Sequence, residues 1–152
     1  MKKIRVSIVG ATGYTGAELL RIVLNHPSLE LGKIVGQSKA GMRVEEVLPS
    51  FAGLIQGTIE HYDPDAIAAA SDAVFCALPH KASAPIVAEL SSKGVVVFDL
   101  SADFRLRELS VYEQWYGPHA VPERFGSAAY GLVELGREAI REASIVAVPG
   151  CY

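Results

Sequence analysis

The sequence has little of what marks secreted or membrane-spanning chains. Its 152 residues include only two cysteines, Cys76 and Cys151, which are too few for a disulfide framework. No apolar run approaches the roughly 20 residues that a membrane-spanning helix needs. The basic start at Met1–Lys3 resembles a signal peptide, but Arg5 and Gly10 interrupt the apolar stretch that should follow. We therefore expect a cytoplasmic protein without a membrane partner.

Repeats, low-complexity tracts and blocks of like charge are also missing. The chain has 14 basic and 17 acidic residues, a formal net charge of −3, and 50% hydrophobic residues. This composition excludes a disordered chain. It argues against a nucleic-acid partner, because phosphate backbones require a basic face. His26, His61 and His119 show no ligand spacing, so we expect no metal.

Short apolar runs alternate with helical patterns along the chain. Strands that are apolar on both faces and separated by helices indicate a parallel sheet covered on both sides. We therefore predict one Rossmann-like, doubly wound α/β domain over residues 1–152. The expected strands are 4–9, 31–35, 58–62, 72–78, 95–98 and 144–148. A first expected helix ends at His26-Pro27, and the others are a short one at 44–48, then 64–70, 83–92 and 137–143. An irregular, aromatic stretch is expected over 101–136.

A glycine-rich turn, Gly10-Ala-Thr-Gly-Tyr-Thr-Gly16, lies between the first expected strand and helix. Glycines permit a tight turn there, and the helix N-terminus offers N–H groups and a positive dipole to a pyrophosphate. The spacing differs by one residue from the commoner dinucleotide motif, and a purely structural turn is the alternative. A mononucleotide P-loop is excluded because Ala17 stands where a lysine is needed. The predicted cofactor-binding residues are Gly10, Thr12, Gly13, Tyr14, Thr15 and Gly16.

The residues after the second expected strand favour NADP over NAD. NAD-binding domains usually place a carboxylate there to bind the ribose hydroxyls. Residues 35–41 contain none, whereas Ser38 and Lys39 offer a hydroxyl and a cation to a 2′-phosphate. The alternative for Lys39 is an ordinary solvated cation of a loop.

The two cysteines are expected to differ in role. Cys76 lies in the middle of an apolar strand and is interpreted as structural. Cys151 follows Pro149-Gly150 at the end of a strand, where parallel sheets bind their ligands. A helix beginning after it would favour the thiolate. Position alone leaves open whether Cys151 is a nucleophile or a bystander.

Several motifs in a fixed order resemble the N-terminal part of the N-acetyl-γ-glutamyl-phosphate reductase family, over nearly all of the chain. They are the glycine turn, Ala77-Leu-Pro-His80, Asp99-Leu-Ser-Ala-Asp-Phe-Arg105, Tyr112 with Trp115-Tyr-Gly117, Tyr130-Gly-Leu132 and Pro149-Gly-Cys-Tyr152. The resemblance implies NADPH-dependent reduction of N-acetyl-L-glutamyl 5-phosphate to the 5-semialdehyde, in arginine biosynthesis. It makes Cys151 the nucleophile, which forms a thioester and expels phosphate.

The same resemblance assigns roles to other positions. Leu78, Pro79 and His80 would line the nicotinamide side of the cofactor. Ser101 and Arg105 would bind the substrate or the leaving phosphate, since a guanidinium binds phosphate bidentately. A structural ion pair from Arg105 to Asp99 or Asp103 is the alternative. The aromatic residues expected to pack the loops over the site are Trp115, Tyr116 and Tyr130.

The chain departs from the family at Val133, where proline is expected, and at Val148, where asparagine is expected. Family members continue past the cysteine with a substrate domain, so the chain is expected to be truncated and to turn over poorly alone. The full-length enzyme is expected to be a homo-oligomer. Aspartate-semialdehyde dehydrogenase, a lysine-pathway aminoadipyl-phosphate reductase, and a non-catalytic NADP-binding module with Cys151 as a sensor thiol remain alternatives.

Overall fold

The computed structural model describes residues 2–151, in which short strands alternate with helices. The chain divides into two compact units, an N-terminal unit ending at Ala77 and a C-terminal unit beginning at Leu78. Met1 lies outside the described residues, as does Tyr152, the last residue of the Pro-Gly-Cys-Tyr motif. Each unit is an α/β structure built on parallel strands, so the expected fold class is confirmed.

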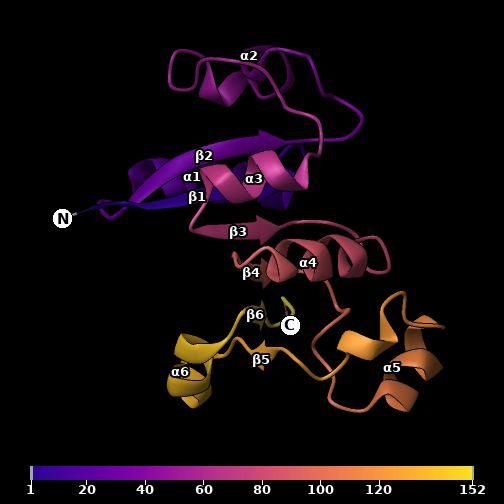
Figure 1. Ribbon diagram of the computed structural model, residues 1–152. Helices are drawn as coiled ribbons and strands as arrows, with labels where there is room; N and C mark the ends of the chain where they lie inside the picture. The colour runs from indigo at the N-terminus through magenta and orange to yellow at the C-terminus, as the bar shows by residue number, and fades with distance from the viewer. Residues whose placement is uncertain (1, 152) are drawn as a thin grey trace. The chain divides into compact units, whose positions relative to one another are not determined.

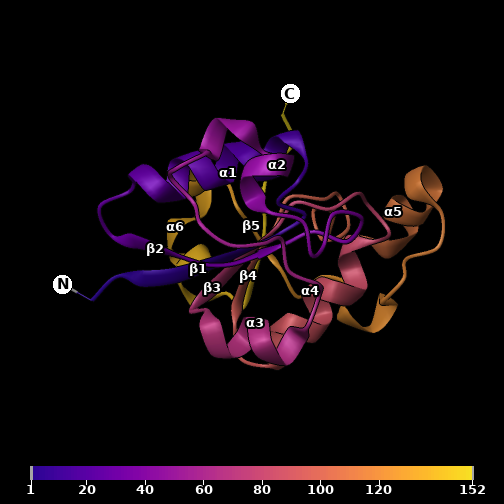
Figure 2. The ribbon, with the colours of Figure 1, turned by 90° about the horizontal axis from the view of Figure 1, so that it is seen from above.

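The N-terminal unit is a three-stranded parallel sheet covered on both faces. Strand β1 (Ile4–Val9) lies between β2 (Leu29–Val35) and β3 (Ala73–Cys76) and pairs with both. Helix α1 (Tyr14–Asn25) and helix α3 (Pro64–Ala70) cover opposite faces of this sheet (Figures 1 and 2). The carboxyl ends of β1 and β2 therefore carry the two loops in which we predict cofactor residues.

Local sequence accounts for the helix boundaries in this unit. Helix α1 ends at Asn25 because His26 precedes a proline and has extended backbone, with ψ of 126°. Helix α3 starts with proline at its first position, where the missing N–H costs nothing. The side chain of Asp63 caps it by accepting from the N–H groups of Asp65 and Ala66, each at 3.0 Å.

A long segment after β2 packs onto the face that α1 covers. It contains the short helix α2 (Val44–Val47) and the 3-10 turn η1 (Pro49–Phe51). The expected strand over 58–62 is wrong: only single bridges form, at Glu60 and Thr58. The buried apolar core of this face includes Val6, Ile8, Leu20, Val23, Ile34, Val44, Leu48, Phe51, Ile55 and Ile59.

The C-terminal unit has a smaller parallel sheet. Strand β6 (Ile145–Ala147) lies between β4 (Val96–Asp99) and β5 (Ala129–Tyr130). Helix α4 (Ser83–Ser92) packs on β4, and helix α6 (Val133–Glu142) packs beside β5 (Figure 1). The carboxyl ends of β4 and β6 lead directly to Ser101 and Cys151 in the chain.

The stretch expected to be irregular, residues 101–136, contains regular elements. They are helix α5 (Leu109–Tyr116), the 3-10 turn η2 (Pro122–Arg124) and β5. Helix α6 begins at Val133, four residues before the expected start, with a kink at Gly136. No helix between residues 2 and 151 is long and apolar enough to cross a membrane.

Candidate cofactor and catalytic site

The glycine turn forms the expected connection between β1 and α1. Gly10 has φ of 85°, a backbone conformation that residues with a Cβ rarely adopt. Gly13 is the N-cap of α1, no side chain caps the helix, and its first turn has no acidic residue. The beginning of α1 therefore keeps its positive end free of a carboxylate from the chain itself.

The other two glycines of the turn serve different needs. A Cβ on Gly16 would lie 2.4 Å from the carbonyl oxygen of Gly10, so the packing of α1 against the turn requires glycine there. Gly13 has ordinary extended backbone, and a Cβ there would meet nothing closer than 3.8 Å. Nothing in the chain requires glycine at position 13, which fits a surface that a ligand approaches closely.

The loop after β2 is attached to the glycine turn. The carbonyl oxygen of Val35 accepts hydrogen bonds from the N–H groups of Gly10 and Ala11, at 2.9 and 3.0 Å. The next residue, Gly36, lies close to Thr12: a Cβ on Gly36 would be only 2.7 Å from the Thr12 methyl carbon. The two loops thus meet at the carboxyl ends of β1 and β2.

Ser38 and Lys39 follow in this second loop, and both are exposed. The carbonyl oxygen of Lys39 accepts a hydrogen bond from Met42, which closes a turn and fixes the backbone of the loop. No carboxylate occurs between residues 36 and 41. The carboxylate of Glu60, whose backbone bridges Val35, forms an ion pair with Lys33 at 2.9 Å.

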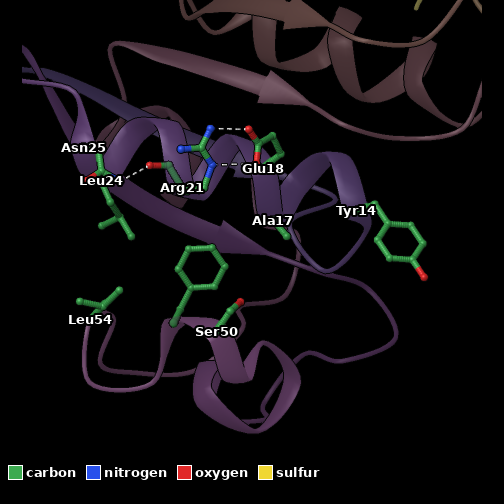
Figure 3. A pocket seen from close by; sticks show the side chains of 9 residues that line it. Tyr14, Ala17, Glu18, Arg21, Leu24, Asn25, Ser50 and Leu54 are labelled. Carbon is green, nitrogen blue, oxygen red and sulfur yellow. Dashed lines mark hydrogen bonds and ion pairs between the residues drawn. The ribbon is translucent and has the colours of Figure 1, made fainter.

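A cavity of about 520 Å³ lies along the outer side of α1 rather than in the glycine turn. It is bounded by Phe51 and Leu54 on one side and by α1 on the other, where Glu18 and Arg21 pair (Figure 3). Among the predicted cofactor residues only Tyr14 lines it, and Figure 3 shows the Tyr14 ring pointing away from the others. Apart from Tyr14, the cavity is therefore lined by residues that the sequence analysis did not predict to bind the cofactor.

In the C-terminal unit, the predicted nicotinamide segment Leu78-Pro79-His80 enters a turn that leads into α4. Lys81, which follows His80, has φ of 68°, the one positive φ at a non-glycine position in the described chain. The ring of His80 contacts the edge of Tyr116, with centroids 5.4 Å apart. His80 is exposed, so its ring remains accessible to a ligand.

Ser101 is buried in a hydrogen-bond network around Asp99. Its hydroxyl donates to Asp99 Oδ2 at 2.7 Å and accepts from the N–H of Asp103 at 3.0 Å. Burial raises the pKa of Asp99, opposed by hydrogen bonds from Ser83 and Ser101. The Ser101 hydroxyl is thus used within the fold at the carboxyl end of β4.

Arg105 forms neither of the ion pairs considered for it. Its Nε donates to the carbonyl oxygen of Val148 at 2.7 Å, and its Nη2 donates to that of Leu100 at 2.6 Å. Among residues 2–151 no carboxylate accepts from its guanidinium, so a partly buried positive charge is held only by neutral carbonyls. This charge lies at the ends of β4 and β6, and Cys151 follows Val148 by three residues.

Cys151 is exposed and Cys76 is buried, as the sequence predicts. The expected loop packing holds for Tyr116, which stacks on Tyr112 at 4.9 Å. It is wrong for Trp115, which is 77% exposed within the chain, and Tyr130 is also half exposed. Within residues 2–151 no group of three or more metal-binding side chains occurs.

Two residues at the centre of the C-terminal unit were given no role in the site by the sequence. Tyr112 is fully buried and donates to Asp103 Oδ1 at 2.8 Å; burial, followed by the hydrogen bond and charge of Asp103, raises its pKa. His119 is buried beside it, with Nε2 2.9 Å from the carbonyl oxygen of Asp103. The sequence did offer one signal: two aspartates four residues apart, Asp99 and Asp103, which the structure joins in one hydrogen-bond network through Ser101.

The structure thus assembles two groups of predicted residues, each within its own unit. The N-terminal unit brings the glycine turn beside the Ser38–Lys39 loop. The C-terminal unit brings Arg105 to the backbone that leads to Cys151. The first group, at the carboxyl ends of parallel strands and the start of a helix, defines a nucleotide-binding α/β domain.

Comparison with known proteins specifies this class further. The family described as semialdehyde dehydrogenase, NAD binding domain, matches residues 5–143, and the chain belongs to it. Proteins named N-acetyl-gamma-glutamyl-phosphate reductase are similar over 98% of the chain: that of Halothermothrix orenii is 47% identical and that of Nitrosococcus oceani 46%. The chain spans 43% and 44% of the length of these relatives.

Solved structures share the fold at lower identity. Aspartate semialdehyde dehydrogenase II from Vibrio cholerae, complexed with ASA, is 20% identical with a TM-score of 0.65, covering 99% of this chain and 42% of that one. The Candida albicans aspartate semialdehyde dehydrogenase with NADP is 19% identical with a TM-score of 0.62, covering 71% of this chain and 32% of that one. These similarities support the α/β nucleotide-binding fold of the chain.

Proposed function

We propose that the chain is the cofactor-binding part of an NADPH-dependent N-acetyl-γ-glutamyl-phosphate reductase. The observation that carries the proposal is the 47% and 46% identity to proteins of that name over 98% of the chain. The family match over residues 5–143 includes residues of both units. We place the protein in the cytoplasm, as a homo-oligomer in its longer form, with an acyl phosphate as substrate.

The geometry of the N-terminal unit supports NADP as the cofactor. The open surface at Gly13 and the uncapped start of α1 suit a pyrophosphate. The adjoining loop presents the exposed Ser38 and Lys39 and has no carboxylate between residues 36 and 41 that would repel a 2′-phosphate. A lysine ammonium binds such a phosphate as a compact point charge.

The C-terminal unit supports acyl transfer to Cys151. Its exposed thiolate would attack the γ-carbonyl carbon of the substrate, forming a C–S bond as the C–O bond to phosphate breaks. When bound, NADPH supplies the hydride that reduces the resulting thioester to the aldehyde level. Collapse of the thiohemiacetal then releases the semialdehyde and the Cys151 thiol.

Arg105 is better suited than Ser101 to bind the phosphate. Its positive charge has no carboxylate partner among the described residues, and it is joined to the segment that carries Cys151. Leaving phosphate gains charge as the thioester forms, so a nearby guanidinium stabilises that step. The hydroxyl of Ser101 is already occupied by Asp99 and Asp103, so its contact with substrate would require that network to open.

Calorimetric titration of the chain with NADP⁺ and with NAD⁺ tests the cofactor proposal. Saturable binding with preference for NADP⁺ is expected, and Lys39→Ala should remove about tenfold of that preference by deleting one charge-assisted contact. Lys3→Ala, at the opposite end of β1, is the matched control and should bind like the unmodified chain. Preference for NAD⁺, or binding of neither, would overturn the assignment.

The acyl-transfer proposal has a separate test. The chain is incubated with N-acetyl-L-glutamyl 5-phosphate, and its intact mass is measured by mass spectrometry. An acyl adduct that maps to Cys151 and is absent from Cys151→Ser is expected. Acylation elsewhere, or none in a chain that binds NADP⁺, would contradict the nucleophile assignment without affecting the cofactor assignment.

A further inference from the structure

The carboxylate of Asp103 holds the turn that follows His80. Asp103 is completely buried, and its Oδ1 accepts from the N–H of Lys81 at 2.9 Å while its Oδ2 accepts from that of Ala84 at 3.0 Å. Asp103 lies after β4, whereas Lys81 belongs to the turn before α4 and Ala84 to the first turn of that helix. One side chain therefore fixes both ends of this turn from a different part of the unit.

The conformation held in this way is one that the turn would not adopt unaided. Lys81 has φ of 68°, which costs free energy for a residue with a Cβ and persists only when its surroundings impose it. The bond from the Lys81 N–H to Asp103 is such a constraint. Strained backbone of this kind is often found where a fold prepares a loop for a ligand.

A second set of contacts runs from Asp103 to the side chain of His80. The hydroxyl of Tyr112 donates to Asp103 Oδ1 at 2.8 Å, and the Tyr112 ring stacks on Tyr116 at 4.9 Å. Tyr116 in turn contacts the His80 ring, with centroids 5.4 Å apart. The backbone of Lys81 and the ring of His80 are thus both positioned by contacts that lead to one buried carboxylate.

We propose that Asp103 is a positioning residue that holds the His80–Lys81 turn ready to meet the nicotinamide end of the cofactor. This inference rests on the proposed function, and on the family resemblance that gives residues 78–80 a role at that end. A turn fixed in advance loses little conformational entropy on binding, so it contributes to affinity without new contacts. Asp103 itself is buried and does not touch the cofactor.

Two ligands separate this role from general stability. NADP⁺ carries the nicotinamide ring, and 2′-phospho-ADP-ribose is the same molecule without it. Asp103→Asn places an amide against a backbone N–H, so the variant should bind NADP⁺ about tenfold more weakly than the unmodified chain. Its affinity for 2′-phospho-ADP-ribose should remain within about twofold, because that ligand lacks the ring that the turn meets.

Two further variants keep the test decisive if Asp103→Asn folds poorly. Tyr112→Phe removes a donor from the same carboxylate but keeps both backbone bonds and the ring stack, so it should lower thermal stability without changing the affinity ratio of the two ligands. Lys81→Gly makes positive φ easy and the turn flexible. It should weaken NADP⁺ binding severalfold and leave thermal stability equal or higher.

The outcomes distinguish this inference from the proposed function. If the unmodified chain binds neither ligand, the cofactor proposal fails and the positioning role fails with it. If it binds NADP⁺ but Asp103→Asn and Lys81→Gly leave the affinity ratio unchanged, the positioning role is overturned and the cofactor proposal stands. Equal affinity of the unmodified chain for both ligands would also overturn it.

Discussion

Arg105 joins the ends of two strands by donating to the carbonyl oxygen of Val148 at 2.7 Å while its Nη2 donates to that of Leu100 at 2.6 Å. The N–H of Val148 also donates to the carbonyl oxygen of Asp99 at 2.8 Å. Val148 is therefore held through both of its backbone polar groups. These backbone bonds are independent of the side chain, so they form with valine at position 148, where the resemblance leads us to expect asparagine.

Arg105→Lys is expected to loosen this connection. A lysine has one compact ammonium, which cannot donate to both carbonyl oxygens as the guanidinium does, so the carbonyl of Val148 or Leu100 loses its partner. We expect the free energy of unfolding to fall by about 1–3 kcal/mol in urea denaturation. Arg107→Lys, at an exposed neighbouring position, should leave it unchanged. Equal effects of the two substitutions would show that the carbonyl bonds contribute nothing.

Two glycine substitutions in the same turn should differ in their effects on stability and on binding. Gly16→Ala forces a Cβ to 2.4 Å from the Gly10 carbonyl oxygen and should destabilise the fold by about 3 kcal/mol. Gly13→Ala makes only an ordinary contact, 3.8 Å from the Gly10 carbonyl oxygen, and should cost less than about 1 kcal/mol, yet it should weaken NADP⁺ binding. Thermal unfolding and calorimetry together measure both effects. A Gly13→Ala chain that binds NADP⁺ normally would show that the phosphates lie elsewhere.

The two cysteines should differ sharply in reactivity. Cys151 is exposed, whereas Cys76 has no exposed surface in β3. Treatment of the folded chain with iodoacetamide should add one label, at Cys151, and a second label at Cys76 only in denaturant. Intact mass and peptide mapping measure this, with Cys151→Ser as the control that should remain unlabelled. Labelling of Cys76 at a similar rate under native conditions would contradict its burial.

Acid stability should depend on the ion pair between Asp72 and Arg5. Hydrogen bonds from Arg5 lower the pKa of Asp72 from 3.8 to about 2. Because the folded pKa is the lower one, the pair contributes stability above pH 3.8 that is lost as the pH falls toward 2. Thermal unfolding between pH 5 and pH 2 should show a shallower decline for Asp72→Asn, and parallel curves would refute the linkage.

The sequence predicted those elements whose apolar pattern and boundary residues agree. The strand 4–9 and the helices 64–70 and 83–92 have the predicted limits: a glycine follows the strand and the second helix, and a capping aspartate and a proline begin the first helix. The strand expected over 58–62 failed because this segment forms only isolated bridges, with Arg43 at Thr58 and with Val35 at Glu60. Helix α5 was missed because only one of its residues, Tyr112, is buried, which leaves little periodicity to detect.

For the candidate site, the sequence predicted where residues lie better than it predicted their hydrogen-bond partners. The glycine turn and the exposed Cys151 occur where the pattern indicated, because both directly follow strands. The carbonyl partners of Arg105 were not predictable, since 43 residues separate it from Val148 and backbone acceptors leave no trace in sequence. The three donors to Asp103 come from two separate segments, residues 81–84 and Tyr112, so only the folded unit reveals them.

The shared acceptor at Val35 has a consequence for engineering cofactor preference. Its carbonyl oxygen accepts from the N–H groups of Gly10 and Ala11. The backbone of residue 35 therefore holds the glycine turn in place, and these bonds need no side chain of the loop that follows. On the proposed function, residues 37–40 can therefore be exchanged: a carboxylate in place of Ser38 and Lys39 should alter recognition of the ribose while the glycine turn keeps its shape.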